Sequence, residues 1–392
     1  MRKVMVVTGS RAEYGLFTPL LRQLQRDPEF ELQLVVTGMH LSPEFGLTCR
    51  EIVRDGFPIA DQVEMLVSSD TPTGIAKSVG LGVIGFADTI RRLQPDLLIV
   101  LGDRFETFAA AQAALFANVP IAHIHGGERT EGQIDEAIRH AITKMAHLHF
   151  VSTEEYRRRV IQLGEQPDRV FHVGALGIDV IRNTNFLSRE ELEQSLSFRF
   201  GKINFLVTYH PVTLSYERNE EDMRQLIDAL DHFPDAHIIF TKPNADTNGR
   251  VIGEMIDQYV AGNKERTAAY TSLGQLRYLS LLNEVDVVIG NSSSGIIEVP
   301  YFRKPTVNIG DRQKGRAHGP TVISCGNGSM QIIRAIEQAL SEEFKKKIQH
   351  AVSIYGDGHA ASKIVEILRT TDFKSLIVKS FYDVRIHGNP GS

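Results

Sequence analysis

The residues with the clearest potential for chemistry lie in a serine-rich segment, residues 290–300. This segment follows an apolar, β-branched run, residues 285–289, which predicts a buried strand, and it then begins a short helix. Hydroxyl groups and backbone N–H groups at a helix N-terminus attract anions. Ser292 and Ser293 are therefore candidates for contacting a phosphate, and Glu298, about one turn further on, for contacting a sugar hydroxyl. A serine that only caps the helix would produce the same pattern.

Ionisable side chains also follow the other predicted strands. In a parallel sheet the carboxyl ends of the strands lie on one edge, and ligands bind beyond that edge. Carboxylates, histidines and arginines concentrated there suit a charged, hydroxyl-rich ligand. Asp135 differs from the rest because it begins a predicted helix, where an acid also complements the helix dipole. The candidates that follow strands are Arg11, Asp103, Arg104, His125, Glu128, His210, Asn244 and Arg312.

The elements that would position these residues alternate between strands and helices along the whole chain. Continuous apolar strands indicate a parallel sheet that is covered by helices on both faces. The pattern is interrupted after residue 173 and restarts at residue 205. We therefore predict an α/β protein with two doubly wound domains, residues 1–175 and 176–359, and a last helix, about 360–380, that joins the first domain. The predicted strands are residues 4–7, 32–36, 97–101, 121–124, 148–151, 170–173, 205–208, 237–241, 285–289 and 306–309.

Composition narrows the range of partners. The chain has 392 residues, of which 42% are hydrophobic, so it can form two domains of about 150–200 residues each. Its formal net charge of −5, with scattered lysines and arginines, argues against nucleic acid or an anionic membrane as a partner. Cys49 and Cys325 lie far apart and form no metal or redox motif. Because no export signal is visible, we expect a cytoplasmic protein.

One glycine motif is misleading. Residues 80–85 spell G-x-G-x-x-G, yet no strand precedes them and the apolar spacing of residues 75–93 is helical, so we expect no dinucleotide site there. The sequence contains no P-loop, no zinc motif and no Asp-x-Asp pair. We therefore expect neither a cofactor nor a metal, and a diphosphate would be bound by arginine, histidine and helix N-termini.

Eight ordered motifs resemble one enzyme family over essentially the whole chain. The family is that of the hydrolysing UDP-N-acetylglucosamine 2-epimerases of bacterial sialic acid synthesis, and the epimerase half of the bifunctional animal enzyme is similar. The motifs are the serine-rich segment through Glu298, GSRAEY at 9–14, LGDRFE at 101–106, HIHGGE at 123–128, DEAIRHAITK at 135–144, YHPVT at 209–213, IGDRQKGR at 309–316 and YGDG at 355–358.

The resemblance implies a GT-B fold, in which two Rossmann-like domains face a cleft and a C-terminal helix crosses back. It also implies the conversion of UDP-N-acetylglucosamine and water into N-acetylmannosamine and UDP. In that reaction UDP leaves together with the C2 proton to give a 2-acetamidoglucal, which is then hydrated. UDP-N-acetylglucosamine and UDP would be the small-molecule partners, and a homo-oligomer, a dimer or tetramer, is expected from the family.

The resemblance also implies roles for the matched residues. Asp103 and Asp135 would be catalytic, and His210 is both a catalytic and a substrate-binding candidate. His125 stands where part of the family has a catalytic glutamate, so the second acid or base is either His125, which can shuttle a proton near neutral pH, or Glu128. Arg11, His210, Ser292 and Ser293 would stabilise the leaving diphosphate, and Glu298 and Arg312 would lie on the nucleotide side. Arg104 and Asn244 are further substrate-binding positions, and the matches at Asn244 and Arg312 are looser.

Several alternatives remain open at this point. Asp103 could instead cap the helix that follows it, and Arg139 and His140 either hold the carboxylates or lie on the surface. His123, between apolar neighbours, is predicted to be packed structure. The substrate could be UDP-2,4-diacetamido-2,4,6-trideoxyglucose, the analogue used in legionaminic acid synthesis. Other readings are a non-hydrolysing epimerase, a GT-B glycosyltransferase, or a sugar-nucleotide sensor without catalytic activity.

Overall fold

The computed structural model describes residues 1–67, 69, 71–129, 134–211, 218–242 and 249–384. The chain divides into two compact units, each with its own sheet. The first unit contains Met1–Val180 and the C-terminal segment from Tyr355, and the second unit contains Ile181–Ile354. Among the helices of the described ranges, none has both the length and the apolar character needed to cross a lipid bilayer.

The first unit is built on a seven-stranded sheet with the order β3-β2-β1-β4-β5-β6-β7, in which every strand pair is parallel. The strands are β1 Arg2–Thr8, β2 Phe30–Thr37, β3 Ile59–Val63, β4 Leu97–Leu101, β5 Ile121–Ile124, β6 Leu148–Val151 and β7 Val170–His172. The α-helices are α1 Arg11–Arg26, α2 Cys49–Arg54, α3 Pro72–Leu93, α4 Phe105–Phe116, α5 Ile134–Met145, α6 Glu154–Gln162, α7 Leu176–Arg182 and α15 Ala360–Thr370. Short 3-10 helices are η1 Gly38–Leu41, η2 Pro43–Phe45, η3 Pro167–Arg169 and η6 Phe373–Ile377.

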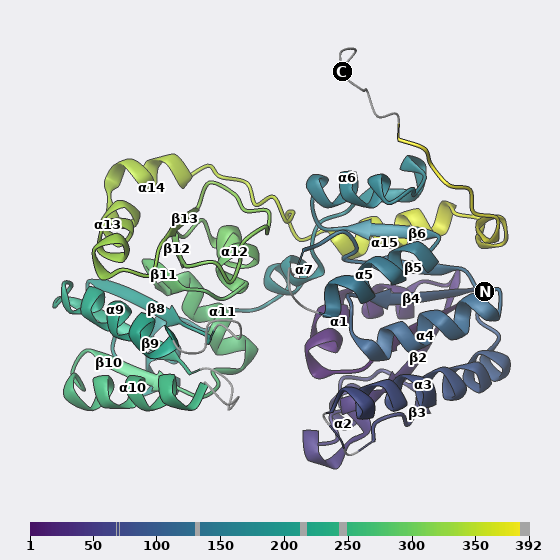
Figure 1. Ribbon diagram of the computed structural model, residues 1–392, viewed down its shortest axis with the longest axis horizontal. Helices are drawn as coiled ribbons and strands as arrows, with labels where there is room; N and C mark the ends of the chain where they lie inside the picture. Colours follow the sequence, from purple (N-terminus) through teal and green to yellow (C-terminus); the bar gives the residue numbers. More distant parts are fainter. Residues whose placement is uncertain (68, 70, 130–133, 212–217, 243–248, 385–392) are drawn as a thin grey trace, which may run out of the picture. The chain divides into compact units, whose positions relative to one another are not determined.

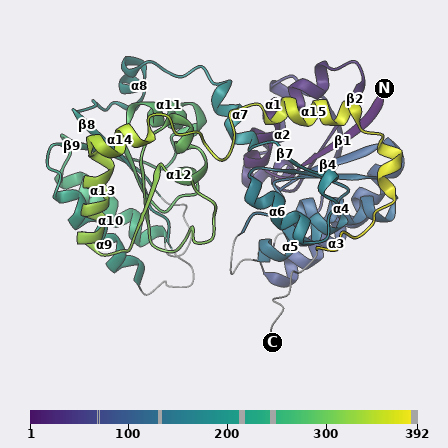
Figure 2. The same ribbon diagram turned by 90° about the horizontal axis from the view of Figure 1, so that it is seen from above.

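Helices cover both faces of this sheet. Helices α1, α2 and α15 contribute to one apolar cluster with the strands, and α3, α4 and α5 contribute to a second cluster on the other face (Figures 1 and 2). The central strand β4 is buried along its whole length, as its unbroken apolar sequence predicts. The predicted parallel sheet with two helical layers is therefore confirmed for this unit.

The second unit repeats this architecture with a six-stranded parallel sheet of order β10-β9-β8-β11-β12-β13. Helices α9, α10 and α13 pack on one face, and α11 and α12 lie on the other (Figure 2). The strands are β8 Ile203–Thr208, β9 Ala236–Thr241, β10 Thr267–Tyr270, β11 Val287–Gly290, β12 Thr306–Ile309 and β13 Val322–Cys325. The helices are α8 Arg189–Leu196, α9 Asn219–Asp231, α10 Gly249–Gly262, α11 Gly274–Glu284, α12 Ser294–Ile297, α13 Ser329–Leu340, α14 Glu342–Ile348 and the 3-10 helix η5 Val299–Phe302.

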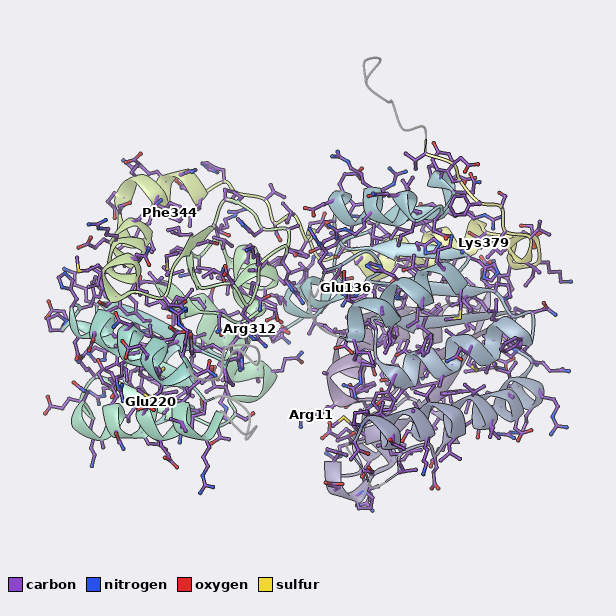
Figure 3. All side chains as sticks on the ribbon, viewed as in Figure 1. Arg11, Glu136, Glu220, Arg312, Phe344 and Lys379 are labelled. Carbon is purple, nitrogen blue, oxygen red and sulfur yellow. The ribbon has the colours of Figure 1, made fainter. Side chains whose placement is uncertain are left out.

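A buried ion cluster ties the C-terminal segment to the first unit. The carboxylate of Glu165 is 2% exposed and accepts hydrogen bonds from Lys144 at 2.6 Å and His149 at 2.9 Å, and it pairs with Lys379 at 2.7 Å. The Lys379 ammonium also donates to the carbonyl oxygens of Lys144 and Ala146, where α5 ends (Figure 3). The C-terminal segment therefore secures one end of α5, the helix that carries Asp135.

Two local predictions are refined by the structure. Strand β11 begins at Val287 rather than at residue 285, because Val285 is the C-cap of α11. The helix after the serines divides into α12 and the 3-10 helix η5, where Pro300 lies in the first turn. The misleading glycine motif lies inside α3, as its helical spacing predicts.

Candidate active site

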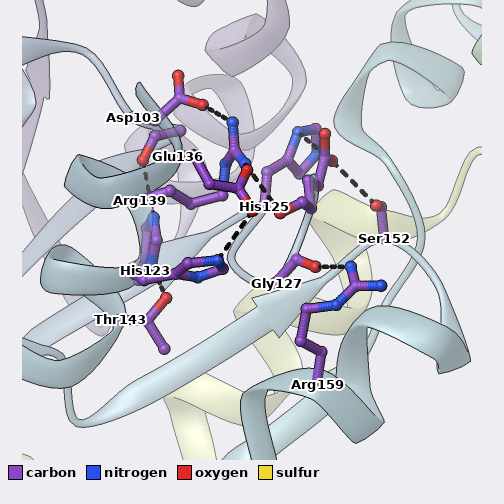
Figure 4. Close-up of polar contacts among 12 residues, drawn as sticks. Asp103, His123, His125, Gly127, Glu136, Arg139, Thr143, Ser152 and Arg159 are labelled. Atoms are coloured by element: carbon purple, nitrogen blue, oxygen red, sulfur yellow. Dashed lines mark hydrogen bonds and ion pairs between the residues drawn. The ribbon is translucent and has the colours of Figure 1, made fainter. Parts of the chain in front are cut away.

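The loop after β4 presents Asp103 to the first turns of α5 (Figure 4). Gly102, with φ of 74°, turns the chain at the strand end, in a conformation that glycine adopts without strain. The alternative role of Asp103 as a helix cap is wrong, because the N-cap of α4 is Arg104, whose side chain makes no capping bond. The Asp103 carboxylate instead accepts a hydrogen bond from the guanidinium of Arg139.

Arg139 is the buried centre of this arrangement. Its side chain is 3% exposed, and besides Asp103 it contacts the Glu136 carboxylate at 2.9 Å and the Glu128 carbonyl oxygen at 2.8 Å. Burial lowers the pKa of Arg139, but the charge of Asp103 and the neighbouring acids outweigh it, and the net shift is upward. Arg139 therefore holds the carboxylates, which was one of the two roles left open by the sequence.

The acids of α5 continue the cluster. Asp135 lies in the first turn, and its pKa is raised by burial and then by the nearby charge of Asp103, while Arg139 and Arg104 act in the opposite direction. Glu136 bridges Arg139 and His140, whose Nε2 lies 3.1 Å from the Glu136 carboxylate. An acid whose pKa is raised exchanges a proton more readily near neutral pH than an ordinary aspartate does.

His125 and Glu128 form a second pair at the end of β5. His125 has φ of 65°, which is uncommon for a residue with a side chain and typical of functional loops. Its Nδ1 lies 3.7 Å from a Glu128 carboxylate oxygen, which also accepts a hydrogen bond from Ser152 at 3.2 Å (Figure 4). The two candidates for the second acid or base are therefore neighbours.

His123, two residues earlier, is buried structure as predicted. It is fully buried, its Nδ1 lies 3.1 Å from the Thr143 hydroxyl, and its Nε2 lies 2.8 Å from the carbonyl oxygen of Gly102. Burial lowers its pKa to about 3, so it is neutral at physiological pH. His123 thus links β5, α5 and the turn that carries Asp103.

In the second unit, the serine-rich segment begins directly after β11. Gly290, with φ of 138°, packs so closely on the backbone of Thr208 that no side chain fits. Ser293 occupies the N-cap of α12, yet its side chain makes no capping hydrogen bond. Helix capping therefore does not explain why a serine stands at position 293. Ser292 and Ser293 lie at the carboxyl end of the sheet, and their contact with a phosphate stays a prediction.

Glu298 is linked to the serines through Ser294. The Ser294 hydroxyl donates to the Glu298 carboxylate, and the Tyr278 hydroxyl contacts Ser294. Burial raises the pKa of Glu298, and the hydrogen bond from Ser294 lowers it in part. A carboxylate in this position accepts hydrogen bonds from hydroxyl groups, which is the role predicted for it toward a sugar.

Asn291 connects the strand ends of the second unit. Its side chain accepts a hydrogen bond from the backbone N–H of His210 at 2.7 Å and donates to the His210 carbonyl oxygen at 2.8 Å. Its own carbonyl oxygen accepts from Arg312 and Gln313, both at 3.0 Å (Figure 3). Partial burial of the guanidinium and the charge of Arg316 lower the pKa of Arg312. Asn291 therefore orders His210 and Arg312 beside the serines.

The remaining predicted residues are placed as follows. Arg11 begins α1, is largely exposed and lies 4.0 Å from Glu51. Arg104 forms two hydrogen bonds with Glu106. Asn244 lies outside the described residues. Within the described part of the chain, no group of His, Cys, Asp and Glu side chains has the arrangement of a metal site.

Sequence reasoning did not single out two of these residues. Glu106 is the only charged residue in the alanine-rich sequence of α4, and a lone acid in an apolar helix is a usable signal. Asn291 gives a weaker signal, because an asparagine at a strand end is common in loops. Its contacts with His210 span 81 positions and could not be inferred locally.

Comparison with known proteins identifies the class. The family model for UDP-N-acetylglucosamine 2-epimerase matches residues 22–369. The chain belongs to the UDP-N-acetylglucosamine 2-epimerase family.

Individual relatives refine this result. The chain is 40% identical over 98% of its length to a GDP/UDP-N,N'-diacetylbacillosamine 2-epimerase (hydrolyzing) of Campylobacter jejuni, covering 99% of that protein. It is 39% identical, with 98% of both chains covered, to the polysialic acid biosynthesis protein P7 of Escherichia coli. It is 36% identical, over 96% of this chain and 98% of the other, to a UDP-N,N'-diacetylbacillosamine 2-epimerase (hydrolyzing) of Legionella pneumophila.

A solved structure shares the fold. The UDP-GlcNAc 2-epimerase from Neisseria meningitidis, bound to UDP-GlcNAc, matches with a TM-score of 0.80 and 19% identity. The match covers 94% of this chain and 100% of that chain. The predicted GT-B-like class, with two parallel α/β domains, is confirmed.

Proposed function

We propose that the chain is a hydrolysing 2-epimerase that converts a UDP-linked 2-acetamido hexose and water into UDP and the free 2-epimeric sugar. The observation that carries the proposal is the group of acids around Arg139, namely Asp103, Asp135 and Glu136, with His125 and Glu128 beside it. Family membership and the hydrolysing relatives support it.

The chemistry requires what this group offers. Elimination needs a base for the weakly acidic C2 proton, and the product differs in configuration, so a proton must be returned to the other face of C2. Asp103, oriented by Arg139, is suited to accept a proton. Asp135, with its raised pKa, is suited to donate or exchange one, and the His125–Glu128 pair can handle the water that is added at C1.

The second unit would bind the nucleotide. Departure of UDP concentrates negative charge on the diphosphate, and this charge is stabilised by hydroxyl, guanidinium and imidazole donors. Ser292, Ser293, His210 and Arg312 supply these groups from neighbouring strand ends. Glu298 would accept hydrogen bonds from sugar hydroxyls of the nucleoside. By the motif match, Arg11 adds a further cation.

Two substrates are supported to different degrees. N,N'-diacetylbacillosamine, which is 2,4-diacetamido-2,4,6-trideoxyglucose, is named as a GDP- or UDP-linked sugar for the relative at 40% identity and as a UDP-linked sugar for the relative at 36% identity. UDP-N-acetylglucosamine is named for a Neisseria meningitidis relative at 30% identity over 87% of this chain. We therefore propose the diacetamido sugar nucleotide as the preferred substrate and UDP-N-acetylglucosamine as the second candidate.

Product analysis tests the proposal. The purified protein is incubated with each sugar nucleotide, and the products are identified by NMR spectroscopy, with Asp103→Asn as the inactive control. We expect free 2-epimerised sugar and one equivalent of UDP. A product that is still a UDP-sugar would indicate a non-hydrolysing epimerase, and UDP binding without turnover would favour a sensor.

A further inference from the structure

The first unit contains a cavity of about 750 Å³ that the reaction chemistry described so far does not use. It lies among η1, η2, the segment after β3, the start of α3 and the start of α4, and its size falls within the usual range of small-molecule sites. Arg104 and Glu106 line it, and Arg104 directly follows Asp103 in the chain. Through Arg104 the cavity adjoins the loop that carries Asp103.

One corner of the cavity is polar and rigidly built. The Glu106 side chain is fully buried, and it accepts hydrogen bonds from Arg104 Nε at 3.1 Å and Nη2 at 3.0 Å. Gly9 and Gly38 make room for it, because a Cβ atom at either position would come within about 3 Å of the Glu106 side chain. A guanidinium held on one side by a carboxylate presents its remaining N–H groups in a fixed direction.

The rest of the lining is largely apolar, with two further acids and the hydroxyl groups of Ser42 and Ser69. Met39, Leu41 and Met65 belong to the walls, and Phe45 and Ile75, which also line it, are 44% and 37% exposed. Large apolar side chains left partly exposed around a cavity favour an occupant with apolar groups. Glu44 and Glu64 add to the negative charge of Glu106, against the single cation Arg104. A diphosphate would be repelled, so the cavity suits a neutral group with methyl substituents.

The shape of a hexose ring relates this cavity to the reacting atoms. C4 lies across the ring from C1, and C5, which carries C6, lies across from C2. When the C1–C2 edge is at the catalytic acids, the C4–C5 edge points away from them and toward neighbouring space. The two candidate substrates differ only there, because one carries an acetamido group at C4 and a methyl group at C6 and the other carries hydroxyl groups.

We propose that this cavity is the specificity pocket of the enzyme and that it receives the C4 acetamido group and the C6 methyl group of the diacetamido sugar. The Arg104 guanidinium donates a hydrogen bond to the acetamido carbonyl oxygen. The walls that include Met39, Phe45 and Ile75 contact the two methyl groups. This inference rests on the proposed function and names the part of the site that chooses between its two substrates.

A pair of substitutions on one helix tests the proposal. Ile75→Trp, in the first turn of α3, fills the mouth of the pocket, whereas Ile84→Trp changes a 66% exposed residue of the same helix that does not line it. The values of kcat/KM are measured for both sugar nucleotides, and thermal unfolding is measured to show that each variant is folded. Phe45→Ala, which removes an apolar wall instead of filling the pocket, serves as a second variant.

We expect a loss of kcat/KM for the diacetamido substrate and little change for UDP-N-acetylglucosamine. Ile75→Trp and Phe45→Ala should each lower kcat/KM for the diacetamido substrate by about 10-fold or more, because contacts with one or two methyl groups provide discrimination of about that size. The kcat/KM for UDP-N-acetylglucosamine should change by less than about 3-fold. Ile84→Trp should change neither. Equal losses for both substrates, or none, would overturn the pocket assignment while the proposed reaction stands. Absence of UDP release from either substrate by the unsubstituted protein would contradict the proposed function, and the pocket assignment with it.

Discussion

Replacing Arg139 by methionine tests the organisation of the candidate site most sharply. Methionine keeps much of the volume of the side chain but removes the cation that contacts Asp103, Glu136 and the Glu128 carbonyl oxygen. Loss of one partner from a fully buried ion pair costs about 3–5 kcal/mol. Because Asp103 and Glu136 each retain 26% exposure, water can solvate them, and we expect a loss of about 2–3 kcal/mol in the free energy of unfolding.

This loss corresponds to a melting temperature lower by about 5–10 °C for a domain of this size. Turnover should fall by about 10²-fold or more, since Asp103 loses the group that orients it. Arg139→Lys keeps the positive charge but loses the bidentate geometry of the guanidinium. Its stability and turnover should therefore lie between those of Arg139→Met and those of the unsubstituted protein. The matched control is Arg158→Met, because the Arg158 side chain is 78% exposed and its 3.6 Å pair with Glu154 should contribute less than about 1 kcal/mol.

The measurements are thermal unfolding, turnover and UDP affinity by calorimetry. UDP affinity should stay near that of the unsubstituted protein, because the proposed nucleotide residues belong to the second unit. Unchanged stability and turnover in Arg139→Met would show that Asp103 does not depend on Arg139.

Three further predictions concern the nucleotide site and the ion cluster. Ser292→Ala and Ser293→Ala should each weaken UDP binding by about 1–3 kcal/mol, measured by calorimetry, and unchanged affinity in the double variant would remove the serines from the site. Asn291→Ala leaves the backbone groups of His210 without their side-chain partner and should cost about 1–3 kcal/mol in urea unfolding, so an unaltered unfolding midpoint would contradict its connecting role. Burial raises the pKa of Glu165, but His149, Lys144 and Lys379 outweigh it and hold that pKa at about 2, below its ordinary 4.5. The stability that Glu165 provides is therefore present above about pH 4.5 and lost as the pH falls toward 2. Glu165→Gln should flatten this part of the curve of stability against pH. The control Glu155→Gln, at an exposed position, should not flatten it.

The fold could be predicted from the sequence wherever a strand is buried on both faces. Strand β4 is a continuous apolar run, and its position and burial follow from that alone. The edge strands β3 and β13 lack this signal, because each has a single buried residue among partly or fully exposed ones and carries polar side chains. These two strands, and β10, were not among the predicted ones.

The candidate site was only partly predictable, because local sequence shows which residues end a strand but not which residues they contact. Strand ends identify which side chains gather at one edge of a sheet, so Asp103, His125 and Ser292 could be proposed from local sequence. The partners of those side chains are set by tertiary structure. Asp103 was a plausible helix cap by its position before α4, yet its carboxylate binds Arg139, which lies 36 positions further along the chain.

The central claim is that the Asp103 and Asp135 carboxyl groups move protons at C2 while UDP is eliminated and water is added. Each of Asp103→Asn and Asp135→Asn should therefore lower turnover by at least about 10²-fold while UDP affinity stays nearly unchanged. Such loss would show that both groups matter, but it would not show where the proton goes.

Mass spectrometry of the sugar released in deuterium oxide tests the claim most directly. The first proton leaves to a base on one face of C2, and the second arrives on the opposite face, so it must come from a group that exchanges with solvent. We expect one deuterium at C2 of the released sugar, and oxygen from water at C1 when the reaction is run in labelled water. A released sugar with only protium at C2 would contradict it, because C2 would then have exchanged no proton with solvent.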